Sequence, residues 1–220
     1  LDSLRFAVGM KVNAPYSMAD MADDTAGLLD AMGIASAHIC GASMGGMIAQ
    51  QLAVRHPARV KSLTLIMTSS GSRKLPGPTL KVRSALISRP ADPKNVQSVI
   101  EHYVKLYRLI GSPGYPAPEA YLHERVGMAV RRAYRPAGTA RQMVAIAADG
   151  NRSPLFAQIG KPTQIIHGKA DPLVPVAAGI DLAAKIAGAQ IDLIAGMGHD
   201  LPPALWPRFV SGIASAAGRV

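Results

Sequence analysis

Short apolar runs and longer amphipathic stretches alternate along much of this chain of 220 residues. Short apolar runs bounded by turn residues are typical of buried strands, whereas apolar residues repeated every three to four positions predict helices. The pattern predicts strands at 37–40, 62–67, 163–166 and 190–194. It predicts helices around them at 17–32, 47–55, 176–187 and 204–217, and leaves residues 1–16 as a loop. Strands that alternate with helices favour an α/β fold with a mostly parallel sheet flanked by helices.

The alternation stops between residues 71 and 152. That region has no strand pattern, and its apolar periodicity predicts helices at 79–88, 94–110, 117–134 and 137–148. We therefore expect a core made of residues 1–70 and 153–220, with residues 71–152 as a helical insertion between two of its strands.

A serine flanked by glycines lies where the strand predicted at 37–40 runs into the next helix. The segment Gly41-Ala42-Ser43-Met44-Gly45 has the pattern G-x-S-x-G. At a sharp turn from strand to helix, a side chain two positions from the serine would collide with the opposite limb, so glycine is expected at 41 and 45. Such a turn exposes the Ser43 hydroxyl and directs the Met44 N–H toward a position that an oxyanion could occupy.

A carboxylate and an imidazole follow later in the chain, each after a predicted strand. Asp171 lies in HGKADPLVP after the strand at 163–166, and His199 lies in GMGHD after the strand at 190–194. A serine hydroxyl becomes a competent nucleophile when an imidazole takes its proton and a carboxylate orients that imidazole. Asp200 is a second choice for the orienting carboxylate. Another histidine, His167, closes its strand and is expected to be structural.

The motifs GASMGG, HGKADPLVP and GMGHD, in this order, resemble those of the α/β-hydrolase superfamily. The overall pattern looks closest to bacterial carboxylesterases related to the anthracycline methyl esterases. The resemblance implies a catalytic triad of Ser43, His199 and Asp171, hydrolysis of a small-molecule ester through an acyl-enzyme, and neither a metal nor an organic cofactor. Lactone or thioester hydrolysis, carbon–carbon bond hydrolysis and a perhydrolase reaction stay open within the same fold.

The helical insertion resembles the cap, or lid, that shapes the substrate pocket in this superfamily. Four side chains within it are candidates for lining that pocket: Tyr103, Tyr107, Met128 and Met143. At helical spacing, the same residues also serve as ordinary packing residues.

The N-terminal part departs from the family pattern, because only 42 residues precede Ser43. Family members normally carry several strands before the nucleophile, and a loop after one of them supplies the second oxyanion N–H. The resemblance therefore implies an N-terminally incomplete hydrolase that lacks this second donor. It also predicts an exposed edge on the nucleophile strand, through which another chain could pair. A catalytically inactive fragment or a ligand-binding, hydrolase-like protein remains an alternative.

Composition bears on whether the protein binds nucleic acid, crosses a membrane or carries disulfides. The net charge is +10, and residues 71–152 carry most of it, with 14 Lys or Arg against 5 Asp or Glu. In the absence of nucleic-acid motifs, this charge is read as a solvated helical exterior. No apolar run approaches the roughly 18 residues of a membrane span. The single cysteine, Cys40, is expected to pack within its strand, and its isolation is compatible with a reducing cytoplasm.

Overall fold

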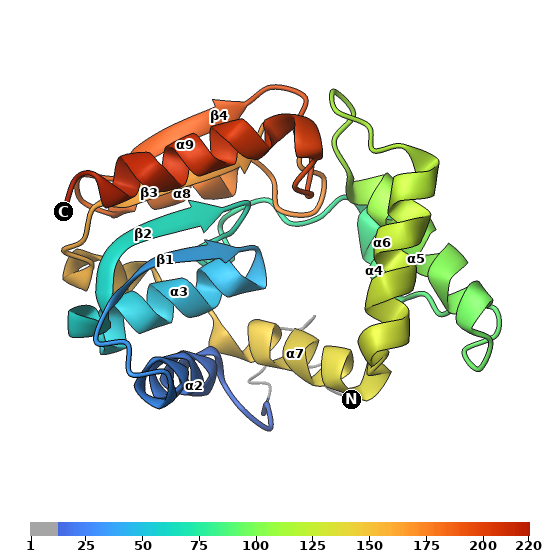
Figure 1. The fold of residues 1–220 in the computed structure, drawn as a ribbon, viewed down its shortest axis with the longest axis horizontal. Helices are drawn as coiled ribbons and strands as arrows, with labels where there is room; N and C mark the ends of the chain where they lie inside the picture. The colour runs from blue at the N-terminus through green and yellow to red at the C-terminus, as the bar shows by residue number, and fades with distance from the viewer. Residues whose placement is uncertain (1–12) are drawn as a thin grey trace.

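The computed structural model describes residues 13–220, and its centre is one parallel sheet (Figure 1). Its strands are β1 (Ala37–Ala42), β2 (Val60–Ile66), β3 (Thr163–Gly168) and β4 (Gln190–Ile194), adjacent in that order. Each neighbouring pair is parallel. The predicted α/β fold class is confirmed. Most of the loop predicted at 1–16 lies outside the described residues.

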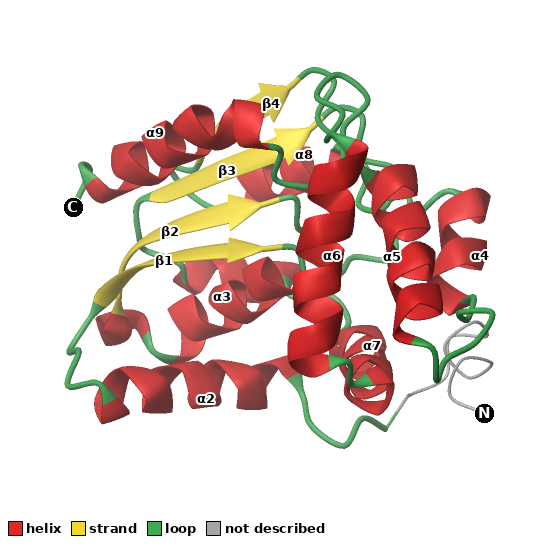
Figure 2. Ribbon diagram, turned by 45° about the vertical axis from the view of Figure 1, so that its right-hand side comes forward, coloured by secondary structure: helices red, strands yellow, loops and turns green. Residues whose placement is uncertain are grey.

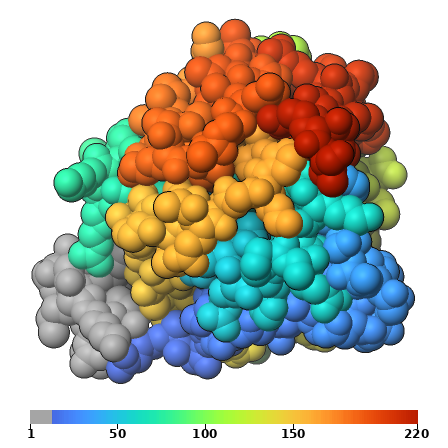
Figure 3. Space-filling view, turned by 90° about the vertical axis from the view of Figure 1, so that its left-hand side faces the viewer, coloured from blue at the N-terminus to red at the C-terminus, as the bar shows by residue number. Residues whose placement is uncertain are grey.

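Helices cover both faces of the sheet because successive strand residues point to opposite sides. On one face, Leu63, Leu65 and Ile165 pack with α3 (Met44–Arg55), α8 (Ala177–Lys185) and, behind α3, α2 (Met18–Ala31). On the other face, Ile66 and Ile166 pack against α9 (Trp206–Ala217). Figure 3 shows segments from both parts of the chain, in blue to cyan and in orange to red, lying against each other. The core is therefore built from residues on both sides of the helical insertion.

Ser17 is the N-cap of the first described helix, α2, and forms two hydrogen bonds with Asp20. The Ser17 hydroxyl accepts from the Asp20 N–H at 3.1 Å, and the Asp20 carboxylate accepts from the Ser17 N–H at 2.7 Å. This reciprocal pair satisfies two N–H groups at the start of α2.

The insertion consists of α4 (Leu80–Ile87), α5 (Val96–Ile110), α6 (Glu119–Ala133) and α7 (Pro136–Asp149). In Figure 2 the strand arrows point toward α6, so the insertion lies at the carboxyl ends of the strands. A small core holds α5 and α6 together, formed by Ile100, Val104 and Val126. We call residues 71–152 the cap; their status as a separate domain stays a prediction. No helix within residues 13–220 is long and apolar enough to cross a membrane.

β1 is an outer strand of the sheet in the part of the chain that the structure describes. Cys40 lies in β1, as expected, but its predicted packing is wrong, because the side chain is exposed. Cys40 is in register with Thr64 of the neighbouring strand β2. The helix α9 packs on β2 and β3, which leaves the Cys40 side chain on β1 uncovered. Pairing of another chain along β1 stays a prediction.

The two connections between core and cap run side by side and are joined by Arg152, which is 2% exposed. Its guanidinium pairs with the Asp149 carboxylate, donates to the Gln50 side chain at 2.9 Å, and donates to the Ser69 carbonyl at 2.6 Å. Its backbone N–H donates to the Ser70 carbonyl at 2.8 Å. Because Gln50 lies in α3, this buried cation ties both ends of the cap to the helix that follows Ser43.

We expect Arg152→Met to lower the free energy of unfolding by about 3–5 kcal/mol, because it leaves the buried Asp149 carboxylate without its cationic partner. The control is Arg55→Met, which breaks an exposed ion pair with Asp23 and should lower the free energy of unfolding far less. Urea unfolding of the two variants measures the difference. Equal losses would show that the Arg152 network stabilises the fold no more than an exposed ion pair does.

Candidate active site

Ser43 occupies a strained turn between β1 and α3, with φ 52° and ψ −120°. A positive φ is unfavourable for a residue with a side chain, so neighbouring groups must hold it. The Ser43 N–H donates to the Ile66 carbonyl at 2.9 Å, and the Thr68 hydroxyl donates to the Ser43 carbonyl at 2.7 Å. The end of β2 therefore braces the turn.

The glycines around Ser43 have different roles. A Cβ on Gly41 would overlap the carbonyl of Gly45, as expected for two limbs of a tight turn. The same expectation is wrong for Gly45, since a Cβ there would meet nothing within 4 Å. Gly46 is the second restricted position, because its Cβ would lie 2.6 Å from the Thr68 side chain.

The helix after the serine starts earlier than predicted, at Met44 rather than at residue 47. Glycines at 45 and 46 weaken the helical pattern in the sequence. In the structure, the N–H groups of Gly46 and Met47 donate to the Ser43 carbonyl at 3.0 and 3.3 Å, which extends the helix back to the turn.

The structure brings together the three side chains predicted as a triad. His199 Nε2 lies 2.9 Å from Ser43 Oγ, and His199 Nδ1 lies 2.7 Å from Asp171 Oδ2. Asp171 and His199 are 6% and 7% exposed. These residues follow β1, β3 and β4, whose carboxyl ends lie at the same edge of the sheet (Figure 1). A hydroxyl, an imidazole and a carboxylate in this arrangement are what activation of a serine requires.

The Asp171 carboxylate is fixed by its own loop. Its Oδ1 accepts from the N–H groups of Leu173 and Val174 at 2.9 and 2.8 Å, which leaves Oδ2 for His199. The buried His167 supports the same loop through a 2.8 Å hydrogen bond from Nε2 to the Val174 carbonyl. Burial lowers the pKa of His167, which favours the neutral ring.

Residues 11–202 match the family model of the alpha/beta hydrolase fold. The chain belongs to this family.

Two relatives of this alpha/beta hydrolase carry different named activities. It is 25% identical over 222 residues to rhodomycin D methylesterase DauP of Streptomyces sp. (strain C5), covering 91% of this chain and 73% of the relative. It is 27% identical over 177 residues to a 2-hydroxy-6-oxononadienedioate/2-hydroxy-6-oxononatrienedioate hydrolase of Pseudomonas sp., covering 79% of this chain and 60% of that relative. The matched segment therefore spans only part of each relative.

A solved structure resembles the fold of this hydrolase. The meta-cleavage product hydrolase CumD from Pseudomonas fluorescens IP01 superimposes with a TM-score of 0.68 at 21% sequence identity. The match covers 94% of this chain and 72% of that one.

Asp200 has a different partner from the one considered for it in the sequence. Asp171, not Asp200, bonds to the His199 ring, whereas the Asp200 carboxylate accepts from the Ser112 hydroxyl. Burial raises the pKa of Asp200, and the hydrogen bond from Ser112 opposes that shift. Sequence reasoning did not identify Ser112, which is a cap residue 88 positions away.

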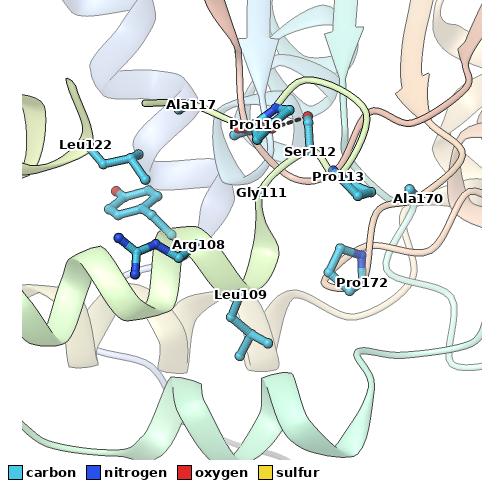
Figure 4. Close-up of a pocket in the computed structure, with 12 residues that line it drawn as sticks. Arg108, Leu109, Gly111, Ser112, Pro113, Pro116, Ala117, Leu122, Ala170 and Pro172 are labelled. Atoms are coloured by element: carbon cyan, nitrogen blue, oxygen red, sulfur yellow. Dashed lines mark hydrogen bonds between the residues drawn. The ribbon is translucent and has the colours of Figure 1, made fainter. Parts of the chain in front are cut away.

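A cavity of about 360 Å³ lies beside the loops that carry Asp171 and His199. Figure 4 shows Arg108 and Leu122 on one side of it and Ala170 and Pro172 on the other. Tyr107, one of the predicted pocket residues, contributes to its wall.

The other predicted pocket residues lie elsewhere in the cap. Tyr103 packs in the core between α5 and α6, with its ring edge-to-face with Tyr134. Met128 and Met143 are 55% and 48% exposed. A role in substrate binding stays a prediction for these three residues and for Tyr107.

Met44 is the first residue of α3, where N–H groups lack partners inside the helix. Its predicted role as an oxyanion donor stays a prediction, and no second donor is assigned.

The turn geometry predicts opposite results for two glycine substitutions. Gly41→Ala forces its Cβ against the Gly45 carbonyl, so we expect a loss of about 2 kcal/mol or more in the free energy of unfolding. Gly45→Ala is the matched control, because it places a Cβ in open space within a helix and should be neutral or stabilising by up to about 1 kcal/mol. Urea unfolding checks both values, and a stable Gly41→Ala protein would contradict the close approach.

Proposed function

We propose that this protein is a serine hydrolase of carboxylic esters, with Ser43 as nucleophile, His199 as general base and Asp171 as the orienting carboxylate. The observation that carries the proposal is the continuous relay from Ser43 Oγ to His199 Nε2, at 2.9 Å, and from His199 Nδ1 to Asp171 Oδ2, at 2.7 Å.

Each residue of the relay has a distinct role in this reaction. Ser43 Oγ attacks the ester carbonyl carbon while His199 Nε2 takes the hydroxyl proton, and the Met44 N–H stabilises the oxyanion of the tetrahedral intermediate. His199 then gives the proton to the leaving alcohol, and the acyl group stays on Ser43. Water hydrolyses the acyl-enzyme, with His199 again acting as base. Asp171 keeps the imidazole in the tautomer that presents an unprotonated Nε2 to the serine.

An ester substrate is favoured by the similarity to the methylesterase DauP over 91% of this chain. Carbon–carbon bond hydrolysis is the second candidate, favoured by the 27% identity to the 2-hydroxy-6-oxononadienedioate hydrolase. Lactones, thioesters and perhydrolysis are further possibilities within the same fold. The proposal includes a small-molecule substrate, no organic cofactor or metal, and a cytoplasmic location.

We expect the protein to hydrolyse p-nitrophenyl esters and to react with a fluorophosphonate at Ser43. Ser43→Ala should abolish labelling and lower kcat by about 10⁴-fold or more, and Asp171→Asn should lower kcat by about 10⁴-fold because it favours the wrong imidazole tautomer. Ser88→Ala, at an exposed cap position, is the control and should leave both unchanged. A well-folded wild type that is not labelled would favour a ligand-binding role.

A substrate panel separates the chemistries that this relay supports. We expect p-nitrophenyl and methyl esters to give a higher kcat/KM than lactones or a vinylogous diketone, each assayed under the same conditions. A higher kcat/KM for the diketone would show that the protein hydrolyses carbon–carbon bonds in preference to esters. A higher kcat/KM for lactones would show that it is a lactonase.

A further inference from the structure

The turn between α5 and α6 lies directly against the loop that carries His199. The His199 N–H donates to the Ile110 carbonyl at 2.7 Å, and the Gly114 N–H donates to the Gly196 carbonyl at 2.9 Å. The two backbones approach so closely that a Cβ on Gly198 would overlap the Gly111 carbonyl. A cap segment and the histidine loop therefore form one paired unit, at the top of Figure 2 near the end of β4.

One side chain joins the residues on either side of His199. The Ser112 hydroxyl oxygen accepts from the Gly198 N–H at 2.9 Å, and the same hydroxyl donates its hydrogen to the Asp200 carboxylate. A serine hydroxyl can serve both as donor and as acceptor, so a single group satisfies both neighbours. Ser112 is 4% exposed, and water has little access to replace it.

The cap thus holds the backbone of the histidine loop, while the core holds the imidazole. Ile110 and Ser112 bind the backbone or side chains of residues 198–200, and Asp171 and Ser43 bind the two ring nitrogens. The His199 ring can lie in line between Asp171 and Ser43 only if its backbone has the correct position. Without the Ser112 hydroxyl, the buried Gly198 N–H and the Asp200 carboxylate would both lose a partner.

We propose that Ser112 is a positioning residue which, through Gly198 and Asp200, fixes the backbone around His199 and makes the α5–α6 turn of the cap part of the catalytic apparatus. The effect of Ser112 on turnover rests on the proposed hydrolase function. Its effect on the His199–Asp171 hydrogen bond does not.

The kinetic test is Ser112→Ala, assayed with a p-nitrophenyl ester. We expect kcat and the fluorophosphonate labelling rate of Ser43 to fall together by about 10- to 100-fold, since a small misplacement of a catalytic group has an effect of this size. KM should change by less than about threefold, because Ser112 positions the base and does not bind substrate. Ser88→Ala is the control for loss of a cap serine hydroxyl, and it should match the wild type.

Variants of Asp200 test whether the two residues act through one bridge. Asp200→Ala should reproduce the loss seen for Ser112→Ala, and the double variant should be no worse than either single one, because the same bridge is removed. Asp200→Asn keeps an oxygen acceptor for the Ser112 hydroxyl, so its kcat should fall less than that of Asp200→Ala. Fully additive effects would contradict a shared bridge. If Ser112→Ala does not fold, the comparison of Asp200→Asn with Asp200→Ala decides the question.

A spectroscopic readout separates this inference from the proposed function. The proton between His199 Nδ1 and Asp171 should give a low-field ¹H NMR resonance, identified by its loss in Asp171→Ala. Ser112→Ala should shift or broaden that resonance, while Ser88→Ala should leave it in place. An inactive wild type with this response would refute the hydrolase function and support the positioning role. An unchanged resonance, or unchanged kcat and labelling, in folded Ser112→Ala would overturn the positioning role.

Discussion

The positive φ of Ser43 is the constraint on which the rest of this structure depends. Such a backbone conformation costs about 1–3 kcal/mol and persists only where its surroundings fix it. Here the Ile66 carbonyl, the Thr68 hydroxyl and the first turn of α3 all bond to the Ser43 backbone. Each such bond contributes only about 0.5–1.5 kcal/mol, so several are needed to hold the turn. The result is a hydroxyl that stands clear of the sheet and within 2.9 Å of His199 Nε2.

Parallel pairing explains why so much of the candidate site could be predicted from the sequence. Once the apolar runs before Ser43, Asp171 and His199 are read as parallel strands, the loops after them must lie at the same edge. The three residues are 128 and 28 positions apart along the chain, but no further information is needed to place their loops together. The cap helices were also predictable to within about two residues, because their caps and apolar periodicity are local features.

Contacts made by the backbone or between distant segments were not predictable in the same way. The motif G-x-S-x-G requires glycine at both 41 and 45. Only the three-dimensional course of the turn shows that a Cβ on Gly46, and not on Gly45, would collide with Thr68. Periodicity places Tyr103 and Tyr107 on α5 but does not tell which one packs against α6 and which one reaches the cavity. Asp200, adjacent to His199 in sequence, was a second choice for the orienting carboxylate, and only the structure shows that it accepts from Ser112 while Asp171 bonds to His199.

Two buried polar connections tie the cap to the core segments next to Ser43 and His199. Arg152 bonds to Gln50 on α3, the helix that begins directly after Ser43, and Ser112 bonds to the residues on either side of His199. Both connections replace water by internal partners, so a shift of the cap would leave buried polar groups unsatisfied at both points. A lid attached only by flexible linkers could move without affecting the nucleophile or the base. The proposed positioning role of Ser112 therefore predicts that the position of the cap and the geometry of His199 are coupled through the bonds of Ser112 to Gly198 and Asp200.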